Sequence, residues 1–205
     1  RHIAVLIVIL FTSCKKFVEI GPPQTQIIRT TVFSTPGGAE SAINGIYSQM
    51  MSSSGFASGG FQSIGYLTGL SADELANYST GLEQAQFFNN SLLPTNQTVN
   101  NYLWQEGYRI LYQANAVIEG LSASALDSVT KSSLIGEARF IRAFSNFYLT
   151  NLFGEIPQVT TTDYLVNNSL IRSSLTDIQK GMLDDLTAAQ HQLAEFYPSP
   201  TGTPT

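Results

Sequence analysis

Apolar residues recur at helical spacing in several separate stretches of the chain. The first stretch begins at Thr35-Pro36, an N-cap followed by proline at the first helical position, and its apolar side chains share one face as far as Met50. Further stretches cover roughly 99–121 and 131–153, and Gly154 after the latter is typical of a helix end. These patterns predict long amphipathic helices.

The last stretch has the most regular spacing. Its apolar residues are three or four positions apart, and Ser174 with Asp177 offers a capping box at its start. None of these helices can bury its apolar face alone, so they must pack on one another, which predicts an all-α fold. One of the distances between successive helix starts is close to the length of a tetratricopeptide repeat. We therefore expect tetratricopeptide-like helical hairpins joined by long irregular loops. The apolar residues of the last stretch are Leu175, Ile178, Met182, Leu186, Ala189 and Leu193.

The segments between the helices carry the candidate ligand contacts. We expect residues 61–75 to be helical or extended, residues 156–164 to be extended, and residues 76–98 to form a long loop rich in Asn, Gln, Ser and Thr. Sugar recognition uses aromatic faces together with planar amides, and this loop supplies both. Alternatively, its phenylalanines are buried anchors. The candidate residues are Asn77, Tyr78, Phe87, Phe88, Asn89 and Asn90.

The N-terminus resembles a bacterial lipoprotein signal. An apolar run from Ile3 to Phe11 would span about 14 Å as a helix, too short for a hydrocarbon core of roughly 30 Å. Thr12-Ser13-Cys14 follows directly and looks like a lipobox, in which the thiol is lipidated. We expect residues 1–13 to be a signal peptide, 14–34 a lipidated extended tether and 35–205 a helical domain. The alternative is a buried strand with an incidental cysteine.

Composition excludes several functions. Charged residues make up 12% of the chain against a usual ~25%, and the net charge of −5 leaves no basic face for nucleic acid. The single cysteine allows no intrachain disulfide. After signal removal His191 is the remaining histidine, so we expect no metal site and no cofactor. Gly-x-Ser-x-Gly and phosphate-binding glycine loops are absent from the sequence.

The charged residues that stand out favour structural roles. Neighbours on a helix point about 100° apart, so neither Asp73-Glu74 nor Asp184-Asp185 makes the opposed carboxylate pair that glycoside hydrolysis needs. We expect Asp184-Asp185 to be solvated. We expect Arg139 and Arg142 to pair with helix-end carbonyls or with acids such as Glu119 or Glu106 rather than to bind an anion. Catalysis is therefore not expected.

Several motifs together resemble one family. Residues 103–110 (LWQEGYRI) followed by 114–119 (ANAVIE) are similar to the W-x3-Y-x-x-I…A-N-x-x-I-E helix of SusD-like (RagB/SusD family) lipoproteins. Residues 136–144 (GEARFIRAF) and 153–157 (FGEIP) look like the family's next helix and the segment that follows it. Ala72-Asp73-Glu74 and Cys14 also match, and the matches occur in family order along the chain.

The resemblance implies a helical protein at the outer membrane, lipid-anchored and facing the cell exterior, that captures oligosaccharides or peptides. It implies delivery of the ligand to a SusC-like TonB-dependent transporter. Family members are considerably longer, and the chain starts at Arg1 and closes on a Pro/Gly/Thr run, so we expect a C-terminal part of the fold to be missing. Two other functions stay open: a helical-repeat scaffold that binds only proteins, and a lipid-anchored glycosidase.

Overall fold

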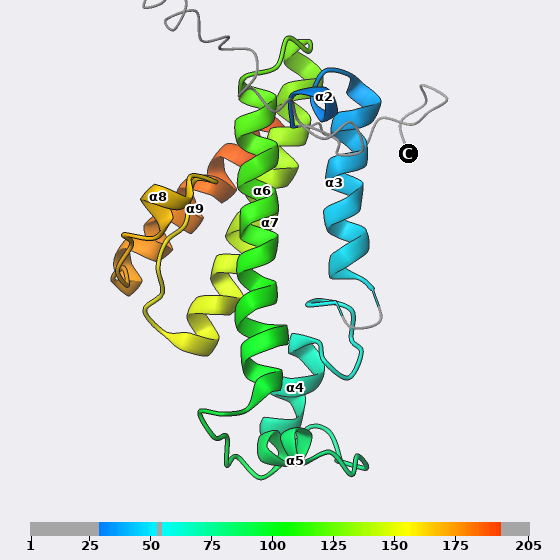
Figure 1. The fold of residues 1–205 in the computed structure, drawn as a ribbon, viewed down its shortest axis with the longest axis vertical. Coiled ribbons are helices and arrows are strands. Elements are labelled where there is room, and N and C mark those ends of the chain that lie inside the picture. Colours follow the sequence, from blue (N-terminus) through cyan, green and yellow to red (C-terminus); the bar gives the residue numbers. More distant parts are fainter. Residues whose placement is uncertain (1–28, 53–54, 194–205) are drawn as a thin grey trace, which may run out of the picture.

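The computed structural model describes residues 29–52 and 55–193. The predicted signal peptide, Cys14 and most of the predicted tether lie outside the described residues. Within them every regular element is a helix, so the predicted all-α class is confirmed for this part of the chain (Figure 1). In chain order the elements are α2 (Arg29–Val32), α3 (Pro36–Met50), α4 (Ile64–Ser71), α5 (Leu82–Phe88), the π-helix η2 (Val99–Gln105), α6 (Glu106–Ser122), α7 (Ser128–Phe153), α8 (Tyr164–Asn167) and α9 (Leu175–Gln192).

Side-chain caps set the helix ends. The Thr35 hydroxyl accepts a hydrogen bond from the Gly38 amide at the start of α3, and the Ser174 hydroxyl accepts one from the Asp177 amide at the start of α9. Helix α7 starts three residues before the predicted position, because the Asp127 carboxylate caps it by accepting from the Thr130 amide at 2.9 Å. It ends as predicted, at Gly154, whose φ of 71° suits glycine.

Helices α6 and α7 form the central pair of the molecule. Helix α9 packs along α7, and α3 packs against α6 and α7, while α4 and α5 gather at the far end of the long pair (Figure 1). The main core lies between α3, α4, α6 and α7, and it includes the fully buried Ile43, Leu67, Ile110 and Ile141. A second, smaller cluster joins α6, α7 and α9 through Leu111, Leu149, Ile156 and Ile178.

Trp104 belongs to this second cluster rather than to a ligand surface. Its ring packs against Tyr108 at 4.8 Å and against Phe153 at 4.9 Å between ring centroids. The Tyr108 hydroxyl donates a hydrogen bond to the Pro157 carbonyl at 2.9 Å, and burial raises the pKa of this hydroxyl although the Arg172 charge lowers it. These aromatic side chains fix the segment after α7 against α6, which is a packing role.

The predicted long loop of residues 76–98 is interrupted by α5, so that expectation was wrong in part. Gly81 gives α5 no side-chain cap, and no cap motif marks its start in the sequence. The helix is held from residues further along the chain: Glu83 accepts from the Thr98 hydroxyl at 2.5 Å and from the Gln97 amide at 3.1 Å. Asn96 donates to Gln86 at 2.9 Å. Tertiary hydrogen bonds of this kind have no local sequence signal.

The apolar stripe of α9 is only half buried. Ile178 and Ala189 face α7 and are buried, whereas Leu175, Leu186 and Leu193 stay 44%, 43% and 39% exposed. The stripe is wider than one neighbouring helix can cover.

Candidate functional site

The six predicted ligand residues fall into different environments. Phe87 is 3% exposed and lies in the main core, which matches the alternative that it anchors the segment. It is therefore no longer a candidate ligand contact. Tyr78, by contrast, is 94% exposed. Phe88 on α5 is 38% exposed, and Asn89 caps the C-terminal end of that helix.

The two remaining asparagines shape the backbone. The Asn77 side-chain oxygen accepts from the Ser79 amide at 2.9 Å, and the Ser79 hydroxyl accepts from the Gly81 amide at 3.0 Å. Asn90 has a φ of 50°, and its amide donates to the Ser71 carbonyl at 3.1 Å. The two bonds around Ser79 order the stretch that carries Tyr78, and the bond from Asn90 ties the end of α5 to the end of α4.

A pocket of about 560 Å³ opens beside Tyr78. Among the predicted residues it is Tyr78 that lines this pocket, and we call it the aromatic pocket. Phe61 is 74% exposed, and its ring meets Tyr66 edge-on, with centroids 5.3 Å apart and planes at 85°. The lining combines aromatic rings with uncharged hydrogen-bonding groups. The lining residues are Phe61, Tyr66, Ala76, Tyr78, Ser79 and Gln84.

Local structure holds the aromatic pocket in place. Ser63 is fully buried and caps α4 by accepting from the Tyr66 amide at 3.3 Å, which fixes the first turn of that helix. The Ser71 hydroxyl donates to the Phe87 carbonyl at 3.0 Å, so α4 and α5 are tied together. Sequence reasoning missed Phe61 and Tyr66. They fall in the segment 61–75, whose conformation the pattern left open.

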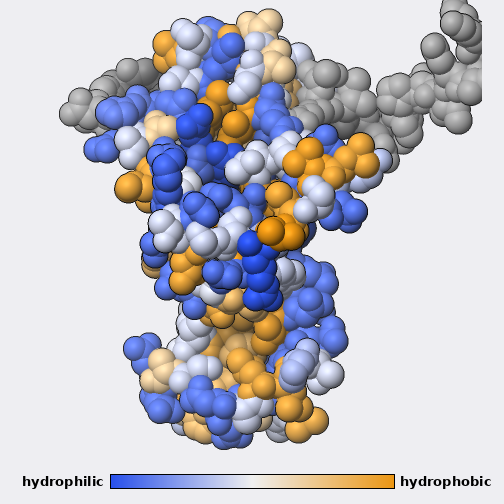
Figure 2. All heavy atoms as spheres, turned by 90° about the vertical axis from the view of Figure 1, so that its left-hand side faces the viewer, coloured by the Kyte–Doolittle hydropathy of each residue, from blue (hydrophilic) through white to orange (hydrophobic). Residues whose placement is uncertain are grey.

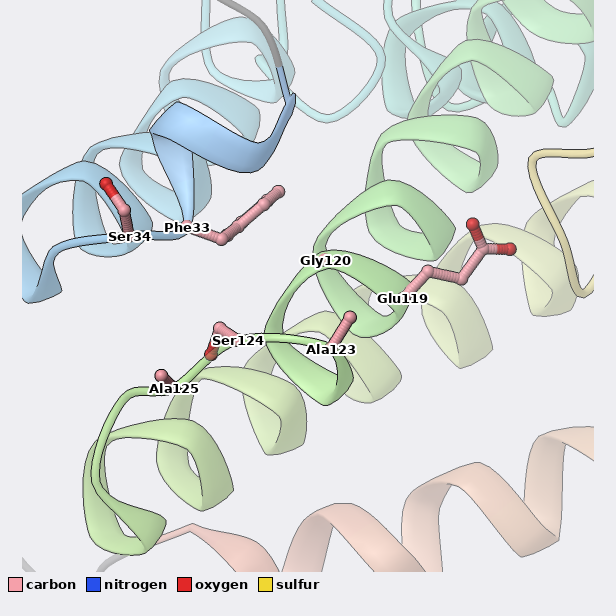
Figure 3. A pocket seen from close by; sticks show the side chains of 7 residues that line it. All are labelled: Phe33, Ser34, Glu119, Gly120, Ala123, Ser124 and Ala125. Atoms are coloured by element: carbon pink, nitrogen blue, oxygen red, sulfur yellow. The ribbon is translucent and has the colours of Figure 1, made fainter.

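A second pocket, of about 520 Å³, lies between the turn after α2 and the end of α6 with the loop that follows it (Figure 3). Its aromatic residue, Phe33, is buried and packs on Gly120, so its ring face is already used. The Glu119 carboxylate accepts from the Thr161 hydroxyl at 2.8 Å and the Thr162 hydroxyl at 2.6 Å. The Glu119 carboxylate thus holds the segment before α8. Because its aromatic ring and its carboxylate are both engaged, this pocket suits a sugar less well than the aromatic pocket does.

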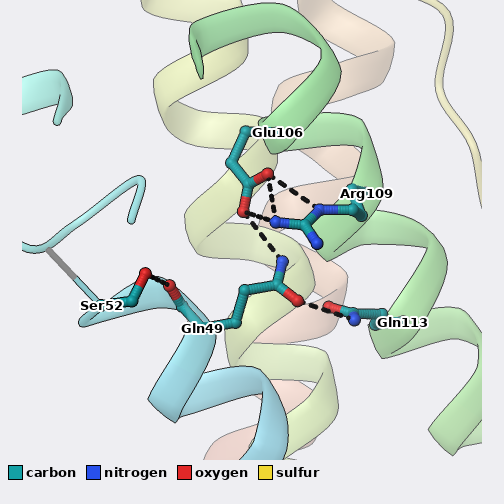
Figure 4. A network of polar contacts seen from close by, with 5 residues as sticks. All are labelled: Gln49, Ser52, Glu106, Arg109 and Gln113. Carbon is teal, nitrogen blue, oxygen red and sulfur yellow. Dashed lines mark hydrogen bonds and ion pairs between the residues drawn. The ribbon is translucent and has the colours of Figure 1, made fainter. Parts of the chain in front are cut away.

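A polar network joins α3 to α6 (Figure 4). Glu106 accepts two hydrogen bonds from Arg109, at 2.8 and 2.7 Å, and one from the Gln49 amide at 2.8 Å. The Gln113 amide donates to Gln49 at 3.0 Å. The Glu106 carboxylate and both polar atoms of the Gln49 amide are engaged within this network, so the network has a structural role.

Arg142 makes the most buried ion pair that the structure describes. Its Nε and Nη2 donate to the two oxygens of Asp185 at 2.7 and 2.6 Å, and its Nη1 donates to the Asn115 oxygen at 2.8 Å. The Asn115 amide donates in turn to the Val159 carbonyl at 3.0 Å. The structural role predicted for Arg142 is confirmed, but its acid is Asp185 rather than Glu119 or Glu106. We call this group the Arg142–Asp185 lock.

The adjacent acids do not form a catalytic pair. Asp185 is 7% exposed, so the expectation that it is solvated was wrong, while Asp184 is exposed and pairs with Lys180 at 3.2 Å. Asp73 is exposed in the turn after α4 with a φ of 58°. None of these acids lines either pocket.

Glu137 is a further buried acid, on α7. Burial raises its pKa, a hydrogen bond with Tyr47 lowers it, and the charge of Glu40 raises it.

His191 is exposed on α9, and over the residues that the structure describes no cluster of three or more His, Cys, Asp or Glu side chains could hold a metal ion. Among these residues no helix is both long and apolar enough to cross a membrane.

A sequence model of the SusD-like family, described as starch-binding associating with outer membrane, matches residues 39–204. The chain belongs to the SusD-like family. A curated relative, SusD-like protein P25 from Formosa agariphila, is 26% identical over 97% of this chain and 39% of its own length. The family predicted from the motifs is thereby confirmed, and the chain spans well under half of this curated SusD-like protein.

Solved structures of SusD-like proteins share the fold. One from Bacteroides fragilis superposes with a TM-score of 0.69 at 20% identity, over 87% of this chain and 34% of that protein. A laminarin-binding SusD-like protein superposes with a TM-score of 0.67 at 20% identity, over 82% of this chain and 36% of that protein. The described helices therefore correspond to one part of a larger SusD-like fold.

Proposed function

We propose that this chain is the N-terminal portion of a SusD-like protein that captures oligosaccharides at the cell surface. The aromatic pocket carries this proposal. It brings Phe61, Tyr66 and Tyr78 together in a family described as starch-binding, with a fold shared by a laminarin-binding protein. Peptides are the alternative ligand class.

The lining of the aromatic pocket has the chemistry that sugars require. Sugar rings present C–H patches that pack on aromatic faces, and their hydroxyls need donors and acceptors at the rim. The exposed Tyr78 and Phe61 offer the faces, and Ser79 and Gln84 offer the hydrogen-bonding groups. A pocket with an apolar floor and a few polar groups is the usual form of a small-molecule site.

The proposed activity is binding without catalysis. Hydrolysis of a glycosidic bond needs two carboxyl groups that face each other across about 5 to 9.5 Å at the sugar. Neither adjacent acid pair serves: Asp185 is bound to Arg142, and Asp184 pairs with Lys180 on the outer side of α9. The aromatic pocket is lined by no carboxylate.

We further propose that Cys14 carries the lipid anchor, that the protein sits on the outer membrane facing the exterior, and that it passes ligand to a SusC-like TonB-dependent transporter. The lipobox-like Thr12-Ser13-Cys14 and the outer-membrane association in the family description support this. Mass spectrometry of the mature N-terminus tests the anchor, and an unmodified Cys14 would contradict it. Co-purification with the transporter tests the partnership.

Binding is tested by native gel electrophoresis of the purified protein in gels that contain laminarin, xyloglucan or starch, with a peptide panel by calorimetry alongside. We expect retardation by at least one glycan and weaker retardation of Tyr78→Ala. Tyr112→Ala is the matched control, because Tyr112 is 53% exposed on α6 and lies outside the pocket lining. Protein that co-purifies with the transporter but binds none of the glycans or peptides would instead be a protein-binding scaffold.

A further inference from the structure

The part of the chain that forms the aromatic pocket has a one-sided charge. Between Arg29 and Arg109 the sequence contains no lysine, arginine or histidine, so its charged residues there are all acids. Helices α4 and α5 and every lining residue of the aromatic pocket fall within this stretch. The two helices lie together at one end of the molecule (Figure 1), and this stretch therefore brings only negative formal charge to that end.

Three of these acids flank the aromatic pocket, and we call Asp73, Glu74 and Glu83 the acidic rim. Asp73 and Glu74 are exposed in the turn after α4. Glu74 stands two positions before the lining residue Ala76, and Glu83 is adjacent to the lining residue Gln84. Because consecutive Cα atoms are about 3.8 Å apart, each of these acids has its Cα within about 7.6 Å of a lining Cα. Salt screens charges over about 8 Å at physiological ionic strength, so the rim acts on a charge bound in the pocket.

Within the described part of the chain, the acidic rim forms no ion pair that would offset its charge. The Glu83 carboxylate accepts from the Thr98 hydroxyl and the Gln97 amide, and both of these donors are uncharged. Arg109 is the first base that follows the rim along the sequence, and its guanidinium already donates to Glu106 at 2.8 and 2.7 Å. The rim therefore keeps its negative charge.

The lining of the aromatic pocket suits an uncharged ligand. Carboxylate and sulfate groups are held in proteins mainly by arginine and lysine, and a charge that leaves water without such a partner is costly to bury. The lining offers uncharged groups instead: the phenols of Tyr66 and Tyr78, the Ser79 hydroxyl and the Gln84 amide. These groups match sugar hydroxyls, whose hydrogen bonds need no opposite charge.

The exposed apolar surface around the pocket points to the same class of ligand. Figure 2 shows hydrophobic side chains among hydrophilic ones at the end formed by α4 and α5, which is the lower end in both views. Phe61, Tyr78 and Leu82 are 74%, 94% and 81% exposed, and they lie before α4, after α4 and at the start of α5. A neutral sugar ring can pack its C–H face on such side chains, whereas a charged substituent would lose water there.

We propose that the aromatic pocket binds uncharged sugar units and that the acidic rim makes it discriminate against glycans that carry carboxylate or sulfate groups. This inference rests on the proposed function and narrows the ligand class to neutral oligosaccharides. Asp73 and Glu74 act as specificity residues: they lie outside the pocket lining and repel an anionic ligand through space. Because the rim is exposed to solvent, the discrimination weakens as the salt concentration rises.

Calorimetric titration of the complete gene product with chemically matched glycans tests the proposal. Laminarin, starch and xyloglucan are each compared as a carboxymethyl derivative, which is anionic, and as a hydroxyethyl derivative, which is neutral and of similar size. In about 20 mM NaCl we expect the carboxymethyl form to have a dissociation constant about tenfold or more above that of the hydroxyethyl form. In about 500 mM NaCl this ratio should fall to about threefold or less.

Neutralising the acidic rim should reduce the discrimination. Asp73→Asn combined with Glu74→Gln preserves side-chain volume, and asparagine tolerates the φ of 58° at position 73. In about 20 mM NaCl this rim variant should lower the ratio at least about threefold and bind the hydroxyethyl form like the wild type. Glu155→Gln combined with Asp184→Asn is the matched control, because it removes two charges from exposed positions outside the pocket lining and should leave the ratio unchanged. Circular dichroism checks that both variants are folded.

Equal dissociation constants for the two derivatives, or a tighter carboxymethyl form, would overturn this inference and leave the proposed function standing. A difference that persists in high salt or in the rim variant would also overturn it, because size or a charge elsewhere would then be the cause. If no parent glycan and no derivative binds, the proposed function fails and this inference fails with it. The salt series uses the wild-type protein, so the test does not depend on the folding of the rim variant.

Discussion

The Arg142–Asp185 lock gives the sharpest prediction about stability. Asp185→Asn removes the charge that faces the guanidinium while it keeps the side-chain volume. The side chains of Arg142 and Asp185 are 13% and 9% exposed, so the arginine charge would remain buried without its partner. Breaking one side of a buried pair costs about 3–5 kcal/mol of unfolding free energy.

The neighbouring aspartate is the control. Asp184 pairs with Lys180, and their side chains are 67% and 76% exposed, so Asp184→Asn should cost about 0–1 kcal/mol. The two substitutions differ by one position on the same helix and have the same chemistry. They therefore separate burial and pairing from any general effect of losing a negative charge on α9.

Urea unfolding followed by circular dichroism measures both effects. With a slope of about 2 kcal/mol per M urea, Asp185→Asn should move the midpoint down by about 1.5–2.5 M, and Asp184→Asn by less than about 0.5 M. The loss for Asp185→Asn should persist in 1 M NaCl, because a buried pair is screened little. Equal midpoints for the two variants would refute the reasoning.

Three further predictions follow from single contacts. Stability should fall as pH rises from about 4.5 through the raised pKa of Glu137, because the folded state holds that proton more tightly than the unfolded state. Glu137→Gln should flatten this part of a profile of melting temperature against pH. An unchanged profile would contradict the assignment. Gly120→Ala should cost about 1–3 kcal/mol in urea unfolding, since a Cβ there meets the Phe33 ring, whereas Gly45→Ala on α3 meets nothing within 4 Å and should be neutral or stabilising. Ser174→Ala should cost about 1 kcal/mol through loss of the α9 cap, and a thermal melt that matches the wild type would show that the cap is not needed.

The helices could be predicted because their signals are local. A cap, an apolar repeat and a terminal glycine lie within a few residues of each other, and α3, α7 and α9 follow them closely. Helix α5 has no such signal, since Glu83 and Gln86 are held by residues 96–98. Its existence depends on contacts that only the folded chain creates.

The roles of single polar residues were harder to predict. Asp184 and Asp185 are adjacent in sequence, and only the packing of α9 on α7 decides which of them is buried. Arg142 and Asn115 belong to the motifs that revealed the family, and the structure shows that they join α6, α7 and α9. The family motifs thus mark packing positions, which explains why they predict the fold better than the ligand site.

The aromatic pocket was predicted in part. Tyr78 was identified from composition, because an aromatic residue among amides and hydroxyls suits a sugar. Phe61 and Tyr66 were missed because Phe61 precedes α4 and Tyr66 lies on it, and only the folded chain brings them to the same pocket as Tyr78, which follows α4. Phe87 was included for the same compositional reason as Tyr78, and burial distinguishes the two.

Calorimetric titration of the lipid-free gene product with the tightest-binding oligosaccharide tests the central claim most directly. Phe61→Ala combined with Tyr78→Ala should raise the dissociation constant about tenfold or more, while Tyr112→Ala should bind like the wild type. The wild-type affinity in the double variant, with the fold intact, would contradict a role for the aromatic pocket in glycan capture.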